Sequence, residues 1–174
     1  MVMGFIFAAV AAGYLFLGGR IYAAGGGHII VDPNVYPVSA VEFMRKNRLQ
    51  GNLIVHFDWG EYAIWKLYPN CKVSIDGRFR TVYPESVIRD HLIFEGSAAK
   101  LYTALEKYPA DLLLFPRTPF TALLIQKKET WAYVYSDALA FVFLRRNENN
   151  KALLHRFQTA GFDYPEPAPA SVFP

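Results

Sequence analysis

Residues Asn52 to Arg80 read NLIVHFDWGEYAIWKLYPNCKVSIDGRFR, and they contain two short apolar runs of the kind found in buried strands. The first run, Leu53–Phe57, and the second, Lys72–Ile75, each end in a small cluster of charged residues and glycine. The carboxyl ends of parallel strands meet along one edge of an open α/β sheet, where ligands usually bind. Side chains that carry function are therefore expected at that edge.

The two clusters form the candidate site. They consist of Asp58, Trp59, Gly60 and Glu61 after the first run, and of Asp76, Gly77 and Arg78 after the second. In a structural interpretation, Asp58 caps the helix that follows, Glu61 favours its dipole, and Arg78 pairs with Asp76 or with Asp58. In a functional interpretation, the carboxylates bind a metal or act as acid and base, and two arginines, Arg78 and Arg80, contact an anion or a sugar.

The residues around the clusters favour the structural interpretation. A metal site would need a third ligand, such as His56 or Asp76, and the spacing of His and Cys does not match a zinc site. The glycines at 25–27 lack the Lys-Ser/Thr pair of a phosphate-binding loop. His91 and His155 fall in helices of mixed polarity, which predicts surface or partly buried positions. The sequence thus predicts no metal, no cofactor and no catalytic residue.

Helical and strand-like patterns alternate along the rest of the chain. Helices are expected from 37 to 50, 60 to 68, 84 to 94, 97 to 108 and 151 to 157, and strands from 53 to 57, 72 to 75, 110 to 115, 131 to 135 and 139 to 144. This order predicts an α/β fold: a three-layer mixed sheet with parallel strands and an antiparallel hairpin at its edge. The predicted parts are an anchor (1–22), a linker (23–36), the α/β domain (37–160) and a Pro-rich tail (161–174), which from Tyr164 on is expected to be extended and outside the core.

The amino-terminal segment has the composition of a transmembrane helix. No charged side chain occurs from Met1 to Gly19, and at about 1.5 Å per residue this run reaches roughly 28 Å, close to the roughly 30 Å hydrocarbon core. A cleaved signal peptide is the alternative, although no Lys or Arg precedes the apolar run. We expect a retained single-pass anchor in membrane lipid, with small residues that let another helix approach at Gly4, Ala8, Ala12 and Gly13.

The composition limits the classes of partner. A net charge of +3, with basic residues scattered among acidic ones, argues against nucleic acid. Aromatic residues make up 16% of the chain, which favours contact with lipid headgroups or with protein. The single cysteine, Cys71, excludes an intrachain disulfide, and we expect it to be buried at the start of a strand.

A set of segments carries a resemblance to a known family. The segments are Tyr36–Phe43 (YPVSAVEF), Gly51-Asn52, Asp58–Trp65 (DWGEYAIW), Val73–Arg78 (VSIDGR) and Trp131–Asp137 (WAYVYSD). Over roughly 36–145 the chain resembles the C-terminal extramembrane domain of multi-span bacterial proteins related to the C-superfamily (GT-C) of glycosyltransferases. The resemblance implies an α/β module outside the cytoplasm, in the periplasm. Such transferases use a lipid-linked sugar donor and acidic loops between many membrane helices, whereas this sequence predicts a single helix.

These observations predict a membrane-anchored accessory subunit rather than an enzyme. It would pack on other subunits of a larger membrane protein complex, such as a photosynthetic or respiratory one, with most of the chain in the periplasm. The alternative is a sugar- or lipid-binding module, or a remnant domain, of a membrane glycosyltransferase. Sugar binding would use Trp59, Tyr62 or Trp65 as exposed aromatic surfaces.

Overall fold

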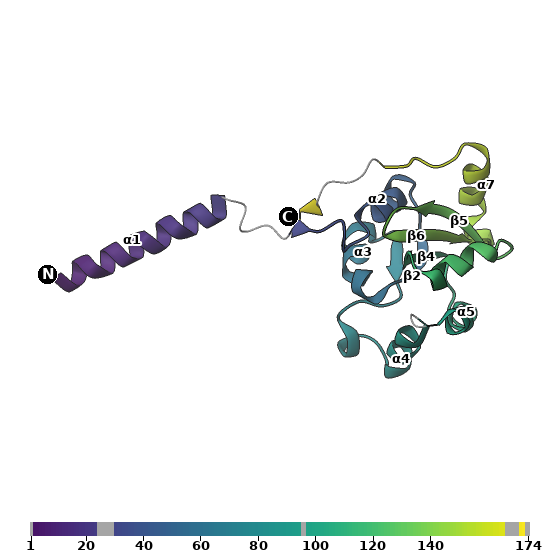
Figure 1. Cartoon of the computed structure of the whole chain (residues 1–174), viewed down its shortest axis with the longest axis horizontal. Helices are drawn as coiled ribbons and strands as arrows, with labels where there is room; N and C mark the ends of the chain where they lie inside the picture. The colour runs from purple at the N-terminus through teal and green to yellow at the C-terminus, as the bar shows by residue number, and fades with distance from the viewer. Residues whose placement is uncertain (1, 24–29, 95–96, 166–170, 173–174) are drawn as a thin grey trace.

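A mixed sheet with the strand order β3-β2-β4-β6-β5 lies at the centre of the fold (Figure 1). The computed structural model describes residues 2–23, 30–94, 97–165 and 171–172. The strands of this sheet are β2 (Gly51–Val55), β3 (Cys71–Val73), β4 (Leu112–Pro116), β5 (Trp131–Ser136) and β6 (Ala140–Arg145). Its first three strands run parallel, and the β5–β6 hairpin joins the free side of β4 in antiparallel pairing. The predicted mixed α/β fold is confirmed.

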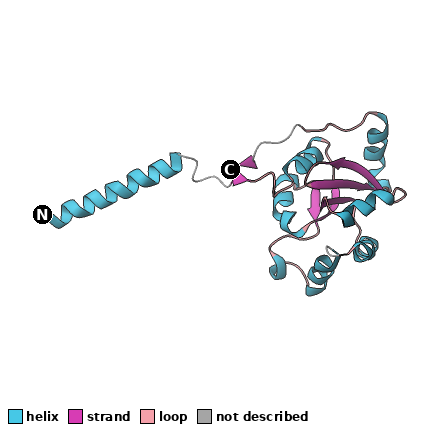
Figure 2. Cartoon of the chain, in the orientation of Figure 1, coloured by secondary structure: helices cyan, strands magenta, loops and turns pink. Residues whose placement is uncertain are grey.

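Helices alternate with these strands, as Figure 2 shows. The α-helices are α1 (Val2–Ala23), α2 (Val38–Lys46), α3 (Gly60–Leu67), α4 (Glu85–Phe94), α5 (Ala98–Lys107), α6 (Pro119–Ala122) and α7 (Lys151–Thr159). Short 3-10 helices are η1 (Phe57–Trp59), η2 (Phe79–Thr81), η3 (Leu123–Gln126) and η4 (Glu148–Asn150). Each expected helix and strand is present, with bounds that differ from the predicted ones by a few residues.

The register of the strands defines two opposite edges of the sheet. Leu53 of β2 pairs with Val73 of β3 and with Leu112 of β4, so these strands end on the same side. Pro116 at the end of β4 pairs with Ala140 at the start of β6, which brings the β5–β6 turn to that side too. We call this side the carboxyl edge, and the side where β2, β3 and β4 begin the amino edge.

The sheet carries a hydrophobic core on each face, because successive side chains of a strand point to opposite faces. On β2, Leu53 and Val55 belong to one buried cluster, whereas Ile54 belongs to the other. The first cluster also contains Phe43 of α2 and Leu67 of α3. The second contains residues of α5 and η3 together with the large aromatic residues of β6. The continuous apolar character of β2 and β4 follows from burial on both faces.

The residues just after α7 pack on the domain, ahead of the Pro-rich segment that begins at Tyr164. Phe162 is 8% exposed and packs in the first core cluster, where its ring meets Phe43 edge-on at 5.6 Å. Asn47 of α2 accepts a hydrogen bond from the Asp163 amide and donates one to its carbonyl. The Tyr164 hydroxyl donates to the carbonyl of Val134 on β5. The packed domain therefore continues past residue 160.

A two-stranded ladder joins the linker to the tail. β1 (Ile30–Val31) pairs antiparallel with β7 (Ser171–Val172). Val31 is 7% exposed and belongs to the first core cluster. The domain therefore begins at this valine, earlier than the predicted boundary at residue 37.

The first prediction tests the packing of the tail. Phe162→Ala removes a buried aromatic ring and leaves a cavity, and we expect a loss of about 2 to 4 kcal/mol in the free energy of unfolding. Urea titration of the full chain in detergent, followed by tryptophan fluorescence, measures it. Leu92→Ala is the matched control, because Leu92 is 51% exposed and its truncation should change stability by less than about 0.5 kcal/mol. Equal effects of the two changes would contradict a packed tail.

Candidate functional site

The two predicted clusters meet at the carboxyl edge through a close backbone contact. Gly60 is the first residue of α3 and is buried against the end of β3. A Cβ atom at this position would lie 2.7 Å from the Cα atom of Asp76 and would collide with the carbonyl oxygen of Ile75. Only glycine permits this approach, so the residue type at position 60 fixes the distance between the clusters.

Asp76 forms the centre of the second cluster. Its side chain is fully buried, and its two oxygens accept hydrogen bonds from the Arg78 guanidinium at 2.8 and 2.6 Å. The Arg78 amide and the Tyr83 hydroxyl donate two more, at 2.9 and 2.7 Å. These donors, Arg78 first, lower the pKa of Asp76 to about 2 against the effect of its burial. The carboxylate is held ionised, as predicted by the pairing of Asp76 with Arg78.

Glu61 joins the first cluster to the second. Its Oε1 accepts a hydrogen bond of 2.5 Å from the amide of Gly77. A side chain at position 77 would collide with that carboxylate, which explains the glycine there. Glu61 also lies in the first turn of α3, where a negative charge is favoured by the helix dipole. The structure thus brings together Gly60, Glu61, Asp76, Gly77 and Arg78.

Asp58 lies outside this group. It is exposed within η1, and no side chain of the described residues caps the start of α3, where Trp59 occupies the N-cap position. The predicted cap is therefore wrong. The intervening 3-10 turn is the physical reason, because it places Asp58 one turn before the free amides of α3.

Trp59 and Tyr62 are core residues. They are 4% and 6% exposed, and the Trp59 indole nitrogen donates a hydrogen bond of 3.0 Å to the carbonyl of Val35. Trp65 is partly buried and packs against the same cluster, with its ring edge-on to Tyr62 at 5.8 Å. Trp59 and Tyr62 therefore offer no exposed ring face to a sugar, and only part of the Trp65 ring is exposed. The three aromatic side chains pack α3 and the Val35 segment against the sheet.

A groove runs over β2 and β3 beside the Asp76 cluster. Its volume is about 370 Å³, and its walls are mainly apolar residues of β2, β3 and α4 and of the segment before β4. Lys72, Ser74, Tyr83 and His91 supply its polar groups. His91 is 2% exposed, so the predicted surface or partly buried position is wrong. Its helix packs on α5 through Asp90, which accepts a hydrogen bond of 2.6 Å from the Tyr108 hydroxyl.

The amino edge carries a second buried carboxylate that the sequence did not single out. Asp111 is 5% exposed and accepts hydrogen bonds from the amide of Asn52 at 3.0 Å and from the side chains of Asn147 and Asn149 at 2.8 and 2.9 Å. These donors lower its pKa although burial raises it. Gly51, at φ +128, passes so close that a Cβ atom would lie 2.7 Å from Oδ2 of this carboxylate. The three asparagines at positions 147, 149 and 150 were the available signal in the sequence.

The described residues contain no group of three or more His, Cys, Asp or Glu side chains placed to hold a metal ion. Cys71 is buried at the start of β3, as expected, and burial raises the pKa of its thiol to about 12. Comparisons with family models, curated proteins and solved structures give no match to this chain. The resemblance to the extramembrane domain of GT-C-related proteins therefore stays a prediction.

The second prediction tests the close contact at Gly60. Gly60→Ala places a methyl group against the backbone of Ile75 and Asp76, and overpacking of this kind should cost about 2 to 3 kcal/mol of stability. Gly161→Ala is the control, because Gly161 has open space around its Cα but a φ of +73, so strain alone should cost about 1 kcal/mol. Denaturant titration compares the two. A loss at Gly60 no larger than that at Gly161 would refute the contact.

The third prediction separates a structural Asp76 from a ligand-binding one. Asp76→Ala leaves Arg78 and Tyr83 without their acceptor and should cost about 1 to 3 kcal/mol. Because the pKa of Asp76 is lowered from 3.8 to about 2, the stability that it contributes is complete above about pH 4 and is lost as the pH falls toward 2. Asp76→Asn should flatten the pH dependence in that window. Asp58→Asn, at an exposed position, is the control.

Thermal melts of the same variants, with and without sugars or divalent metal, provide the second readout. If Asp76 is structural, the change lowers the melting temperature and added ligands shift neither protein. A variant that melts like the wild type but loses a ligand-dependent shift would assign the cluster to binding.

Proposed function

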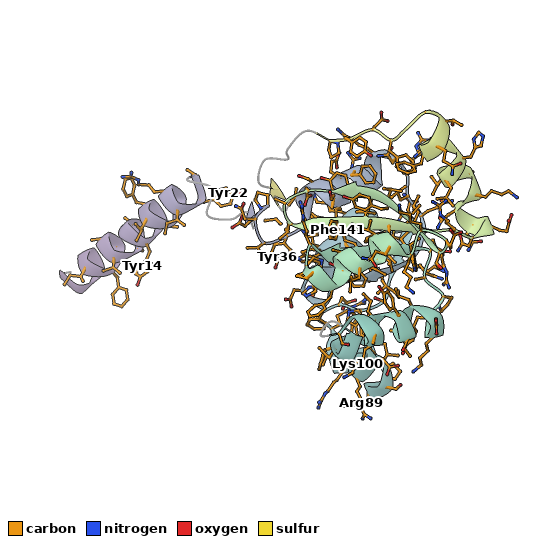
Figure 3. The ribbon with its side chains drawn as sticks, turned by 45° about the vertical axis from the view of Figure 1, so that its right-hand side comes forward. Tyr14, Tyr22, Tyr36, Arg89, Lys100 and Phe141 are labelled. Atoms are coloured by element: carbon orange, nitrogen blue, oxygen red, sulfur yellow. The ribbon has the colours of Figure 1, made fainter. Side chains whose placement is uncertain are left out.

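We propose that the chain is a membrane-anchored accessory domain, without catalysis of its own, that packs on a larger membrane protein complex. The observation that carries the proposal is α1. Its window Ile6–Ala23 is long and apolar enough to cross a membrane, and none of that window is buried by the rest of the described chain. Exposure of so much apolar surface to water is unfavourable, and lipid removes the cost. Tyr14 and Tyr22 project from this helix, Tyr14 from its middle and Tyr22 from the end that leads to the domain (Figure 3).

The state of the candidate site supports an accessory role. Asp76 is ionised with a strongly lowered pKa, and its oxygens already accept four hydrogen bonds. A general base works best with a pKa near the operating pH, and a carboxylate in this state has little affinity for a proton. Glu61 is engaged with the Gly77 amide. The clusters are used to join α3, β3 and η2, which is a structural task.

The proposal takes the domain to be a three-layer module in the periplasm, with α2 and α3 on one face of the sheet and α4 and α5 on the other. The two core clusters on opposite faces support the layers. The resemblance to GT-C-related extramembrane domains supports the compartment. Contact with a partner helix is assigned to the small residues of α1, at Gly4, Ala8, Ala12 and Gly13.

The alternative is a sugar- or lipid-binding module, and the groove over β2 and β3 is the observation that favours it. An apolar groove of about 370 Å³ with a few polar groups has the size and character of a small-molecule site. Tyr83 lines this groove and also bonds Asp76. The thermal melts with added sugars therefore report on this alternative as well.

The fourth prediction tests the anchor and the assembly together. Ala12→Arg places a charge near the centre of α1, which should disfavour membrane insertion by about 2.5 to 3.5 kcal/mol and move the chain into the carbonate-soluble fraction. Ala12→Leu should leave the chain in the membrane, yet block close approach of a partner helix and abolish co-migration with a larger complex in mild detergent. Val10→Leu, on the opposite side of α1 from Gly4, Ala8 and Ala12, is the control for both measurements.

The results distinguish the two parts of the proposal. A soluble wild-type chain would refute the anchor. A wild-type chain that stays in the membrane but migrates as a free monomer in native mass measurement would refute the accessory role alone.

A further inference from the structure

The carboxyl edge displays apolar side chains to solvent. Val35, Val82 and Phe120 are 56%, 50% and 48% exposed, and each lies where the chain leaves or approaches this edge. Val35 belongs to the turn before α2, Val82 follows η2, and Phe120 lies in the first turn of α6 just after β4. We define the carboxyl-edge surface by these residues together with Leu123, Arg80 and Arg117.

The length of the connection to α1 limits how far this surface can lie from the membrane. Residues 24–29 are all that separates Ala23, the end of α1, from Ile30, the start of β1. Seven Cα steps reach at most about 25 Å even when fully extended. Arg20 and Tyr22, near the end of α1, are residue types that prefer the interface between lipid and water. The point where the domain begins therefore lies within about 25 Å of the headgroups.

The beginning of the domain is fixed on the carboxyl edge and not on another face. Val31 is buried in the core, and Asp32 accepts backbone hydrogen bonds from Val35 and Tyr36 that close a tight turn. The Trp59 indole holds the carbonyl of Val35 at the end of β2. In Figure 1, β1 lies on the same side of the domain as the turn between β5 and β6, and Asn34 and Tyr36 line one pocket with Asp137 of that turn. A short tether attached to this side turns the carboxyl edge toward the bilayer.

The charged residues of the carboxyl-edge surface are compatible with the headgroup region of a bilayer, which is polar overall. Arg80 lies 3.9 Å from Glu85, with both side chains exposed, and Arg117 is exposed near Asp137, to whose carbonyl it donates a hydrogen bond. Arg80 is thus paired with a carboxylate and Arg117 with a backbone carbonyl, and the two arginines do not form the cluster of cations that marks a site for anionic lipid. Apolar and arginine side chains side by side suit the headgroup region, where arginine reaches the phosphates.

We propose that the carboxyl-edge surface rests on the phospholipid headgroups of the bilayer that α1 spans. This inference depends on the proposed anchoring by α1. The tether supplies a high effective concentration of membrane, so the surface needs only weak affinity of its own. The contact sets the orientation of the domain, with the amino edge and Asp111 directed away from the membrane.

The fifth prediction uses the chain's single cysteine. Cys71 is buried, and its replacement by alanine gives a background for single-cysteine labelling of the full chain. Val82→Cys and Phe120→Cys report on the carboxyl-edge surface. Tyr68→Cys and Lys128→Cys are matched exposed controls, because Tyr68 lies just before β3 and Lys128 just before β5, both at the amino edge. Leu15→Cys reports on α1.

Each labelled chain is placed in liposomes of neutral phosphatidylcholine that contain lipids with a fluorescence quencher at the headgroup or in the acyl chain. We expect headgroup quenching at positions 82 and 120 to exceed that at 68 and 128 by at least about twofold, with little change in high salt. Acyl-chain quenching should be strong at position 15.

The outcomes separate this inference from the anchoring. Strong quenching at position 15 with equal, weak quenching at the other positions would overturn the inference and leave the anchor intact, as would stronger quenching at 68 and 128. Weak quenching at position 15 would overturn the anchoring, and the inference with it. Edge positions that are unquenched in liposomes but protected from thiol reagents in native membranes would assign the surface to a protein partner and overturn the lipid contact.

Discussion

A negative charge buried at the end of β3 controls the arrangement of the carboxyl edge. Asp76 has no contact with solvent, and an unpaired carboxylate there would cost several kcal/mol. Arg78 and Tyr83 supply the compensating hydrogen bonds, and both come from the segment that immediately follows. Because the buried charge of Asp76 is stabilised only when Arg78 and Tyr83 reach it, residues 76 to 83 fold back over the carboxyl edge. Gly60 brings α3 close enough for Glu61 to hold the same loop.

The amino edge also contains a buried carboxylate that is stabilised by hydrogen bonds, but its donors are different residues. Asp111 is paired with amides in place of a guanidinium, and these come from β2 and from the segment before α7. Each edge also contains a glycine, Gly60 or Gly51, at the point where a side chain would collide with the acid or its backbone. The two buried carboxylates thus tie each end of β2 and its neighbours to segments distant from the sheet. These contacts cover the two ends of the apolar cores. Loops without such contacts would leave the ends of the cores exposed to water.

The fold was largely predictable from the sequence, and the fine contacts were not. Periodicity and turn residues gave the alternation of helices and strands, because burial on both faces leaves a continuous apolar run in β2 and β4. The pair Asp76 and Arg78 could be predicted because both residues lie in one turn. The packing of Phe162 was not predicted, because the proline content of the segment that follows carries no signal of a buried ring before it. Asp111 was missed because its partners lie 36 to 59 residues away.

The pairing of β1 with β7 connects the packing of the tail to the attachment of the domain. Phe162 packs in the first core cluster, the Tyr164 hydroxyl bonds the carbonyl of Val134, and β7 farther along the tail pairs with β1. A force transmitted along the linker would therefore act on the ladder and, through it, on the tail and Asn47 of α2. Because Val31 is buried in the first core cluster and β1 pairs with β7, the packed domain begins at β1, and both ends of the tail are fastened to it.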